Sequence, residues 1–279
     1  MLEMIIQSLR WTHIIAGFMA FFVAPVALIT QKGGLAHRRW GKVYFWAMTV
    51  GTITALIVAA YRPNIFLLLI ALFSFYLSFT GYRVLSRKRP DQGQRATMLD
   101  WSVTLLTLLA SMIMLGLGFY NPSRNAMRLE PLFAVFGFLG TTGAASDIKK
   151  FVRPPQEKYA WWFDHMSGMV ASYIAAVSAF SVVNFNFLPP LVRWLWPTAI
   201  GVPLLTIWIR SYQKNSRNVL ALTRSQRQKP ARSLKYLADF FLHDNSWSDK
   251  LQFVTSLQDY CNPCDKLKFV TPEPNGELL

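Results

Sequence analysis

The stretch 164–184, DHMSGMVASYIAAVSAFSVVN, decides the fold that we predict for this chain. It is long and apolar enough to cross a bilayer as a helix, which takes about 20 residues, yet it opens with an Asp-His pair. At 100° per residue its small side chains share one narrow face with His165: Gly168, Ser172, Ala175, Ala176 and Ala179. Such a face lets a neighbouring helix approach closely in lipid. The stretch therefore predicts a central, tightly packed transmembrane helix with an imidazole at one end.

Composition places most of the chain in a membrane. Of its 279 residues, 53% are hydrophobic and 15% are charged, whereas about a quarter of the residues in a soluble domain are charged. The formal net charge is +15, but the basic residues sit in short segments between apolar runs, which favours a role in membrane orientation over binding to nucleic acid. The start of the chain carries Glu3 and no basic stretch, so we expect no removable signal peptide.

Seven apolar runs, each close to the length of a spanning helix, cover about 11–30, 43–60, 64–83, 98–119, 129–147, 165–187 and 191–209. The segments after the first, third and fifth runs carry thirteen basic residues: Lys32, Arg38, Arg39, Lys42, Arg83, Arg87, Lys88, Arg89, Arg95, Lys149, Lys150, Arg153 and Lys158. The N-terminus and the other connectors carry five: Arg10, Arg62, Arg124, Arg128 and Arg193. The positive-inside rule then predicts an all-α bundle of seven transmembrane helices in the inner (cytoplasmic) membrane, with the N-terminus outside and the C-terminus in the cytoplasm.

The chain divides into a membrane domain, residues 1–210, and a short helical cytoplasmic tail, residues 211–279. Within the tail, residues 216–242 are basic and amphipathic, so we expect them to lie on the anionic inner leaflet or against a membrane protein partner. Cys261 and Cys264 form a single CxxC pair, and the cytoplasm would keep both thiols reduced. Their role is left open.

The pattern of the first helix and first connector resembles a known family. His13 and Gly17 are followed by Lys32-Gly33-Gly34, by His37-Arg38-Arg39-Trp40-Gly41 and by Tyr44, and the helix from His165 to Asn184 forms a second block. These motifs are similar to those of the bacterial predicted membrane-protein family called domain of unknown function 2306. The likeness covers roughly the first 210 residues. It implies the same membrane fold and brings no established chemistry with it.

Two more helices carry a polar or small stripe that ends in an acid. One stripe comprises Asp100, Thr104, Thr107, Ser111 and Gly118, and the other Gly137, Gly140, Gly143, Ala144 and Asp147. Since lipid offers no partner for these groups, we expect both stripes and that of His165 to converge on one polar pocket in the cytoplasmic half. The predicted ligand-binding residues are His37, Arg38, Asp100, Asp147, Asp164 and His165. The alternative is that they only anchor helix ends, paired with connector cations.

Three functions fit this pattern. The leading one is a non-enzymatic protein, a transporter or an accessory subunit, that binds a small ligand, ion or cofactor in the pocket. The second is a b-haem oxidoreductase, for which His37 and His165 are the two axial-ligand candidates on one side, although His37 is expected in a connector. The third is a hydrolase using a divalent metal held by the same histidines and an aspartate, without an HExxH motif. His13 lies at the opposite end and is expected to be a hydrogen-bonded packing residue.

Overall fold

The computed structural model describes residues 1–120, 130–155, 157 and 159–213. These residues contain no strand, and they form seven helices that are each long and apolar enough to cross a membrane. The helices are α1 Leu2–Ile29, α2 Leu35–Tyr61, α3 Ile65–Arg83, α4 Met98–Phe119, α5 Glu130–Val152, α6 Ala160–Asn184 and a seventh helix, Pro190–Gln213. For the described residues, the predicted all-α class with seven helices long and apolar enough to span a membrane is thereby confirmed. The predicted tail, with Cys261 and Cys264, lies outside the described residues beyond 213.

Several helices extend past the apolar runs that predicted them. Helix α1 begins at Leu2 and α2 at Leu35, each about two turns earlier than the corresponding run, and α6 begins at Ala160. A helix satisfies its own backbone hydrogen bonds, so its polar first turns can stand outside the hydrocarbon. One consequence is a correction: His37, which we expected in a connector, lies in the first turn of α2.

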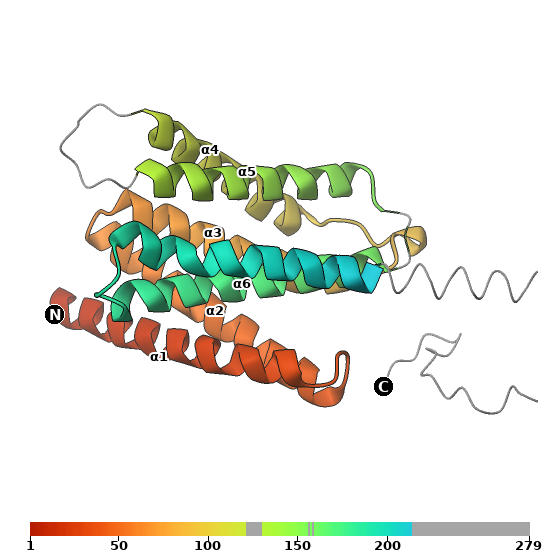
Figure 1. The fold of residues 1–279 in the computed structure, drawn as a ribbon, viewed down its shortest axis with the longest axis horizontal. Coiled ribbons are helices and arrows are strands. Elements are labelled where there is room, and N and C mark those ends of the chain that lie inside the picture. The colour runs from red at the N-terminus through yellow and green to blue at the C-terminus, as the bar shows by residue number, and fades with distance from the viewer. Residues whose placement is uncertain (121–129, 156, 158, 214–279) are drawn as a thin grey trace, which may run out of the picture. The chain divides into compact units, whose positions relative to one another are not determined.

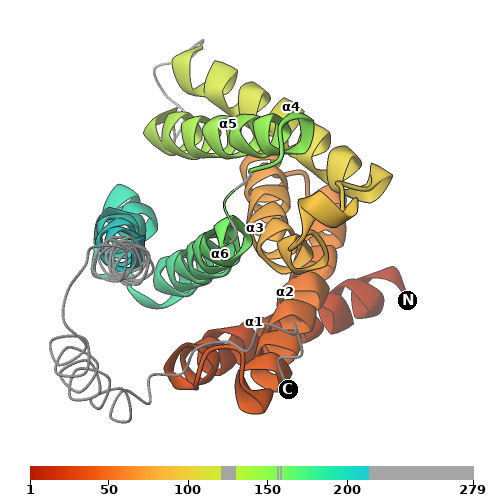
Figure 2. The same ribbon diagram turned by 90° about the vertical axis from the view of Figure 1, so that its right-hand side faces the viewer.

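Helices α3 and α6 occupy the centre of the bundle (Figures 1 and 2). Helix α1 packs along α2, and α4 packs along α5, so that two helical hairpins flank the centre. Helix α3 contacts both hairpins as well as α6. The connectors that follow α1, α3 and α5 lie together at the right-hand end of the bundle in Figure 1, which we call the basic end.

Small residues bring the helices of the bundle into close contact, as their spacing predicted. A Cβ atom built on Gly168 of α6 would lie 2.5 Å from the Cα of Gly81 in α3. Between α4 and α5, one on Gly140 would overlap the Oγ of Ser111, and one on Gly118 would lie 2.5 Å from the backbone nitrogen of Ala134. Glycine is therefore required at these crossings, where the backbones touch.

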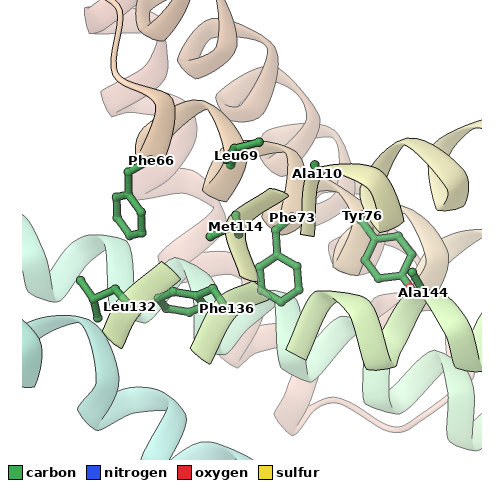
Figure 3. Close-up of a cluster of buried hydrophobic side chains, with 9 residues drawn as sticks. All are labelled: Phe66, Leu69, Phe73, Tyr76, Ala110, Met114, Leu132, Phe136 and Ala144. Carbon is green, nitrogen blue, oxygen red and sulfur yellow. The ribbon is translucent and has the colours of Figure 1, made fainter. Parts of the chain in front are cut away.

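The apolar core lies where α3 meets the α4–α5 hairpin (Figure 3). It consists of Phe66, Leu69, Phe73, Tyr76, Ala110, Met114, Leu132, Phe136 and Ala144. The seventh helix closes this core at one end through Trp194, whose ring meets that of Phe66 edge to face at 5.0 Å. The ring of Tyr76 belongs to this core, and its hydroxyl group lies at the basic end.

The packing face of α6 changes along its length. Ser172 is fully buried, and the Tyr44 hydroxyl of α2 lies 2.7 Å from its Oγ. Ala179, which we placed on the same face, is exposed, and Ser178 and Ser181 are buried instead. The reason is that the second half of α6 packs on the seventh helix, where Trp196 donates a hydrogen bond to Ser181.

Candidate functional site

A cavity of about 240 Å³ opens at the basic end, between α3, α5, α6, the connector 84–97 and residues 154, 155 and 157 of the connector after α5. Its lining contains seven charged side chains: Arg87, Lys88, Arg95, Asp147, Lys150, Glu157 and Asp164. Three aromatic residues, Tyr76, Phe151 and Trp161, complete its polar and stacking surface. The volume lies just below the roughly 300–1,000 Å³ of typical ligand pockets, so the cavity suits a small molecule or part of a larger one.

One wall of the cavity is a chain of paired acids. The Tyr76 hydroxyl donates a hydrogen bond of 2.8 Å to Oδ2 of Asp147. The Nζ of Lys150 lies 3.5 Å from Oδ1 of Asp147 and 2.8 Å from Oδ1 of Asp164. The three ionised side chains are 18% to 36% exposed. A single ammonium thus holds together two carboxylates that would otherwise repel each other, and it joins the end of α5 to the start of α6.

The connector between α3 and α4 places two cations of the lining on aromatic faces of α5 and α6. The guanidinium carbon of Arg87 lies 4.6 Å from the centre of the Phe151 ring, and the Lys88 Nζ lies 4.5 Å from that of Trp161. Phe151 is itself held edge to face by Trp101 of α4 at 5.3 Å. The Nε of Arg87 is buried and has no hydrogen-bond partner. This arrangement fixes the two cations without neutralising them.

The connector between α3 and α4 has its own local structure. It continues α3 through a 3₁₀ turn, η1 Val84–Ser86, and then forms a second one, η2 Pro90–Gln92. Pro90 suits the first position of that turn, and Gly93 ends it at φ 80°, in the left-handed region that favours glycine. The backbone N–H of Arg89 donates to the Gln94 side chain at 3.0 Å. These turns set Arg87 and Lys88 at the edge of the cavity.

Asp100 does not reach the cavity. Its side chain is 1% exposed, and Arg83 donates to both of its oxygens, from Nε to Oδ1 and from Nη2 to Oδ2, each at 3.0 Å. Its Oδ2 also accepts hydrogen bonds from the backbone and hydroxyl of Thr97, which forms the capping box of α4. Asp100 is thus fully engaged in starting α4 and in joining it to the end of α3.

The two histidines at the basic end form a separate pair. His37 places Nδ1 2.9 Å from the carbonyl oxygen of Ala27, and His165 places Nδ1 2.7 Å from that of Gly81. A carbonyl oxygen only accepts, so Nδ1 is the donor in each contact and Nε2 is the nitrogen that the contact leaves available. The ring centres are 6.2 Å apart at an interplanar angle of 84°.

The structure thus distributes the six predicted site residues over several places. Asp147 and Asp164 line the cavity, Asp100 pairs with Arg83, and the two histidines face each other outside the cavity lining. Arg38 is exposed on α2 and is not part of the lining. The expected convergence of all three stripes on one pocket is therefore wrong: Asp100 and His165 do not line the cavity. The acids instead form ion pairs with cations near the helix ends. Those cations are Arg83 and Lys150.

Sequence reasoning missed Tyr76, Arg83, Arg87 and Lys150 as residues of these clusters. A signal existed for two contacts: Thr97-x-x-Asp100 has the spacing of a capping box, and Asp147 and Lys150 are three apart on one helix. Arg87 and Lys88 looked like ordinary positive-inside charges, and nothing in their spacing distinguishes them. In the first half of α1, His13 places Nδ1 2.8 Å from the carbonyl oxygen of Gly51, as expected for a hydrogen-bonded residue, but it is exposed and so is not the packing residue that we expected.

The third alternative required three metal ligands. Within the part of the chain that the structure describes, no group of three or more His, Cys, Asp or Glu side chains is placed to hold a metal ion. The pair of His37 and His165 is the closest approach to such a group that the contacts above include.

No family model, curated protein or solved structure matches this chain. The resemblance of residues 1–210 to domain of unknown function 2306 therefore stays a prediction. The fold by itself defines the class: a helical protein whose seven long apolar helices are compatible with a multi-pass membrane protein.

Proposed function

We propose that this chain is a multi-pass membrane protein that binds a small charged ligand in the cavity at the basic end, as a transporter or an accessory subunit. The observation that carries the proposal is the cavity itself, with its seven charged lining residues in an otherwise apolar bundle. Ionisable groups are costly within membrane segments and are functional candidates by default. The seven charged residues of this cavity come from two helices and two connectors, a placement that helix orientation alone does not require.

The orientation is part of the proposal. Twelve of the thirteen positive residues counted above are described by the structure and belong to the basic end, so by the positive-inside rule this end faces the cytoplasm of a cell whose inner membrane holds the protein. The ligand would then enter the cavity from the cytoplasmic side, where the exposed side chains of Arg95 and Glu157 form part of its lining.

A cavity-filling variant tests the proposal. A Cβ atom on Gly143 would lie 3.6 Å from the Tyr76 hydroxyl, in ordinary contact, so Gly143→Leu introduces its side chain at the lining without a backbone clash. Gly116→Leu is the matched control, because Gly116 is exposed on α4 and nothing lies within 4 Å of its Cβ position.

The measurement is the unfolding temperature of the purified full chain with each member of a library of small charged compounds. A ligand at about 100 times its Kd stabilises a protein by about 2.7 kcal/mol. We expect at least one compound to stabilise the unmodified chain and Gly116→Leu, and to leave Gly143→Leu unchanged. Stabilisation of all three proteins, or of none, would contradict a ligand site in this cavity.

One observation favours a second candidate, the b-haem oxidoreductase. His37 and His165 face each other, and each gives its Nδ1 to a backbone carbonyl, as histidines that ligate metals commonly do. An absorption spectrum of protein purified from membranes tests this candidate directly. A Soret band that disappears in His37→Ala and His165→Ala would support it, and its absence after growth with added haem precursor would remove it.

A further inference from the structure

The cations of the cavity divide into two kinds. Lys150 is neutralised by Asp147 and Asp164. Arg87, Lys88 and Arg95 have no carboxylate within ion-pair distance among the residues that the structure describes. Lys150 thus engages the two carboxylates on the α5–α6 wall, whereas the cations of the connector wall form no ion pair with any described residue.

The Phe151 ring covers one face of the Arg87 guanidinium, and the other side of this group lies at the cavity. Phe151 lies against its guanidinium carbon at 4.6 Å, and that contact leaves the N–H groups at the edge of the guanidinium to find other partners. The buried Nε has none. A buried N–H without an acceptor costs free energy, and native proteins keep such a group where a water or a ligand completes it. Lys88, held over Trp161, adds a second cation to the same lining.

We infer that the connector wall binds a phosphate group, with Arg87 as the main hydrogen-bond donor and Lys88 and Arg95 as supporting charges. This inference rests on the proposed function and names the ligand chemistry of the same cavity. The fork of N–H groups on arginine fits two oxygens of a tetrahedral oxyanion, and lysine supplies a point charge. A phosphate group at this location has two sources: a soluble phosphate compound, or the headgroup of an anionic lipid in a basic pocket between helices.

The test uses the full chain in nanodiscs of zwitterionic lipid. Inorganic phosphate is titrated by calorimetry, and retention of phosphatidate is measured by native mass spectrometry after adding that lipid to the discs. The variants are Arg87→Gln, Arg87→Lys and the control Arg39→Gln. Arg39 is exposed on α2, at the same end of the bundle and outside the lining, so its removal changes the net charge equally.

We expect Arg87→Gln to weaken binding of at least one probe about tenfold or more, since a hydrogen bond to a charged group contributes about 1.5–3 kcal/mol. Arg87→Lys should recover part of this loss by keeping the charge, and Arg39→Gln should stay within about twofold of the unmodified chain. Binding of inorganic phosphate identifies a soluble ligand, whereas retention of phosphatidate alone identifies a lipid headgroup.

Equal losses in Arg87→Gln and Arg39→Gln would overturn the inference, because they would show attraction by surface charge alone. Failure of both probes to bind would also overturn it. If a compound without phosphate still stabilises the unmodified chain and not Gly143→Leu, the proposed function stands and only the phosphate assignment falls. If no compound stabilises the unmodified chain in this selective way, the proposed function and the phosphate assignment are both contradicted. Should Arg87→Gln not fold, Lys88→Gln replaces it, because Lys88 is an exposed cation of the same lining, and we expect a smaller loss than for Arg87→Gln but a larger one than for Arg39→Gln.

Discussion

Gly81 and Gly168 meet at the crossing of α3 and α6 with no room for a side chain on either one. The Cβ position of Gly81 lies 2.7 Å from the backbone nitrogen of Met169, and that of Gly168 lies 2.5 Å from the Cα of Gly81. Because Gly81 has no side chain to cover its backbone, His165 can also reach the carbonyl oxygen of Gly81. Close helix approach and the histidine contact thus depend on the same two glycines.

Substitution at this crossing should destabilise the bundle. Gly81→Ala and Gly168→Ala force a methyl group against backbone atoms, so we expect each to lower the free energy of unfolding by about 1–3 kcal/mol, as overpacking does. Gly17→Ala in α1 is the control, since nothing lies within 4 Å of its Cβ position. Thermal unfolding in detergent measures the difference. Equal unfolding temperatures for all three variants would show that α3 and α6 are not tightly packed there.

The Arg83–Asp100 pair should behave as a buried ion pair. Asp100→Leu leaves an arginine without its partner, and Arg83→Met leaves a carboxylate that is 1% exposed. Loss of one partner of a buried pair costs about 3–5 kcal/mol, whereas replacing both with apolar residues is often close to neutral. The double variant should therefore be more stable than the sum of the single effects predicts. A double-mutant cycle of unfolding free energies checks this, and strict additivity would mean that the two residues do not interact.

Lys150 should contribute more to the free energy of unfolding than the neighbouring Lys149. Lys150→Gln removes the ammonium between Asp147 and Asp164, and we expect a loss of about 1–3 kcal/mol in unfolding free energy, between the values for exposed and buried pairs. Lys149→Gln is the matched control, because Lys149 is exposed and one position away. Adding Asp164→Asn to Lys150→Gln should recover much of the loss by removing the repulsion between carboxylates. No recovery would contradict a role for Lys150 as the shared counter-ion.

The proposed orientation has a direct readout. A reporter active only in the cytoplasm, fused after Gln94 in the connector between α3 and α4, should be active. The same reporter fused after Asn186, between α6 and the seventh helix, should be inactive. The opposite pattern would reverse the orientation and would place the cavity on the outer face.

The seven spans were predictable because hydrocarbon thickness sets the length of an apolar run, and nothing else in the chain competes with that signal. The ends of the helices were less predictable than their number. Helix α2 begins at Leu35 with His37, Arg38 and Arg39, and such polar residues read as a loop when only hydropathy is considered. The stripes of α4 and α5 were predicted as buried faces, and Thr104 and Ser111 are indeed buried. Lipid tails offer a hydroxyl group no hydrogen-bond partner, so a stripe of hydroxyl and small residues packs against another helix.

The candidate site was predictable only in part. That Asp147 and Asp164 lie near each other follows from their places at the end of α5 and the start of α6. Asp100 pairs with Arg83 instead of lining the cavity. This pairing depends on which helices pack side by side, and a single sequence contains no direct signal for that. The cavity also needed Phe151 beneath Arg87, a contact between a helix and a connector that are far apart in the chain.

The central crossing of the bundle also has a consequence for how the protein is made. Each hairpin, α1–α2 and α4–α5, can close as soon as its second helix leaves the ribosome. The contact of His165 with Gly81 joins residues 84 positions apart, so α3 must wait for its partner while two other helices are synthesised. At about 5–20 residues per second this interval lasts roughly 4–17 s. Until then the face of α3 at Gly81 lacks the helix that covers it in the folded protein. Biogenesis is therefore the stage at which the centre of this protein is most open to mispairing, and changes that slow the release of α6 should lower its yield before they lower its stability.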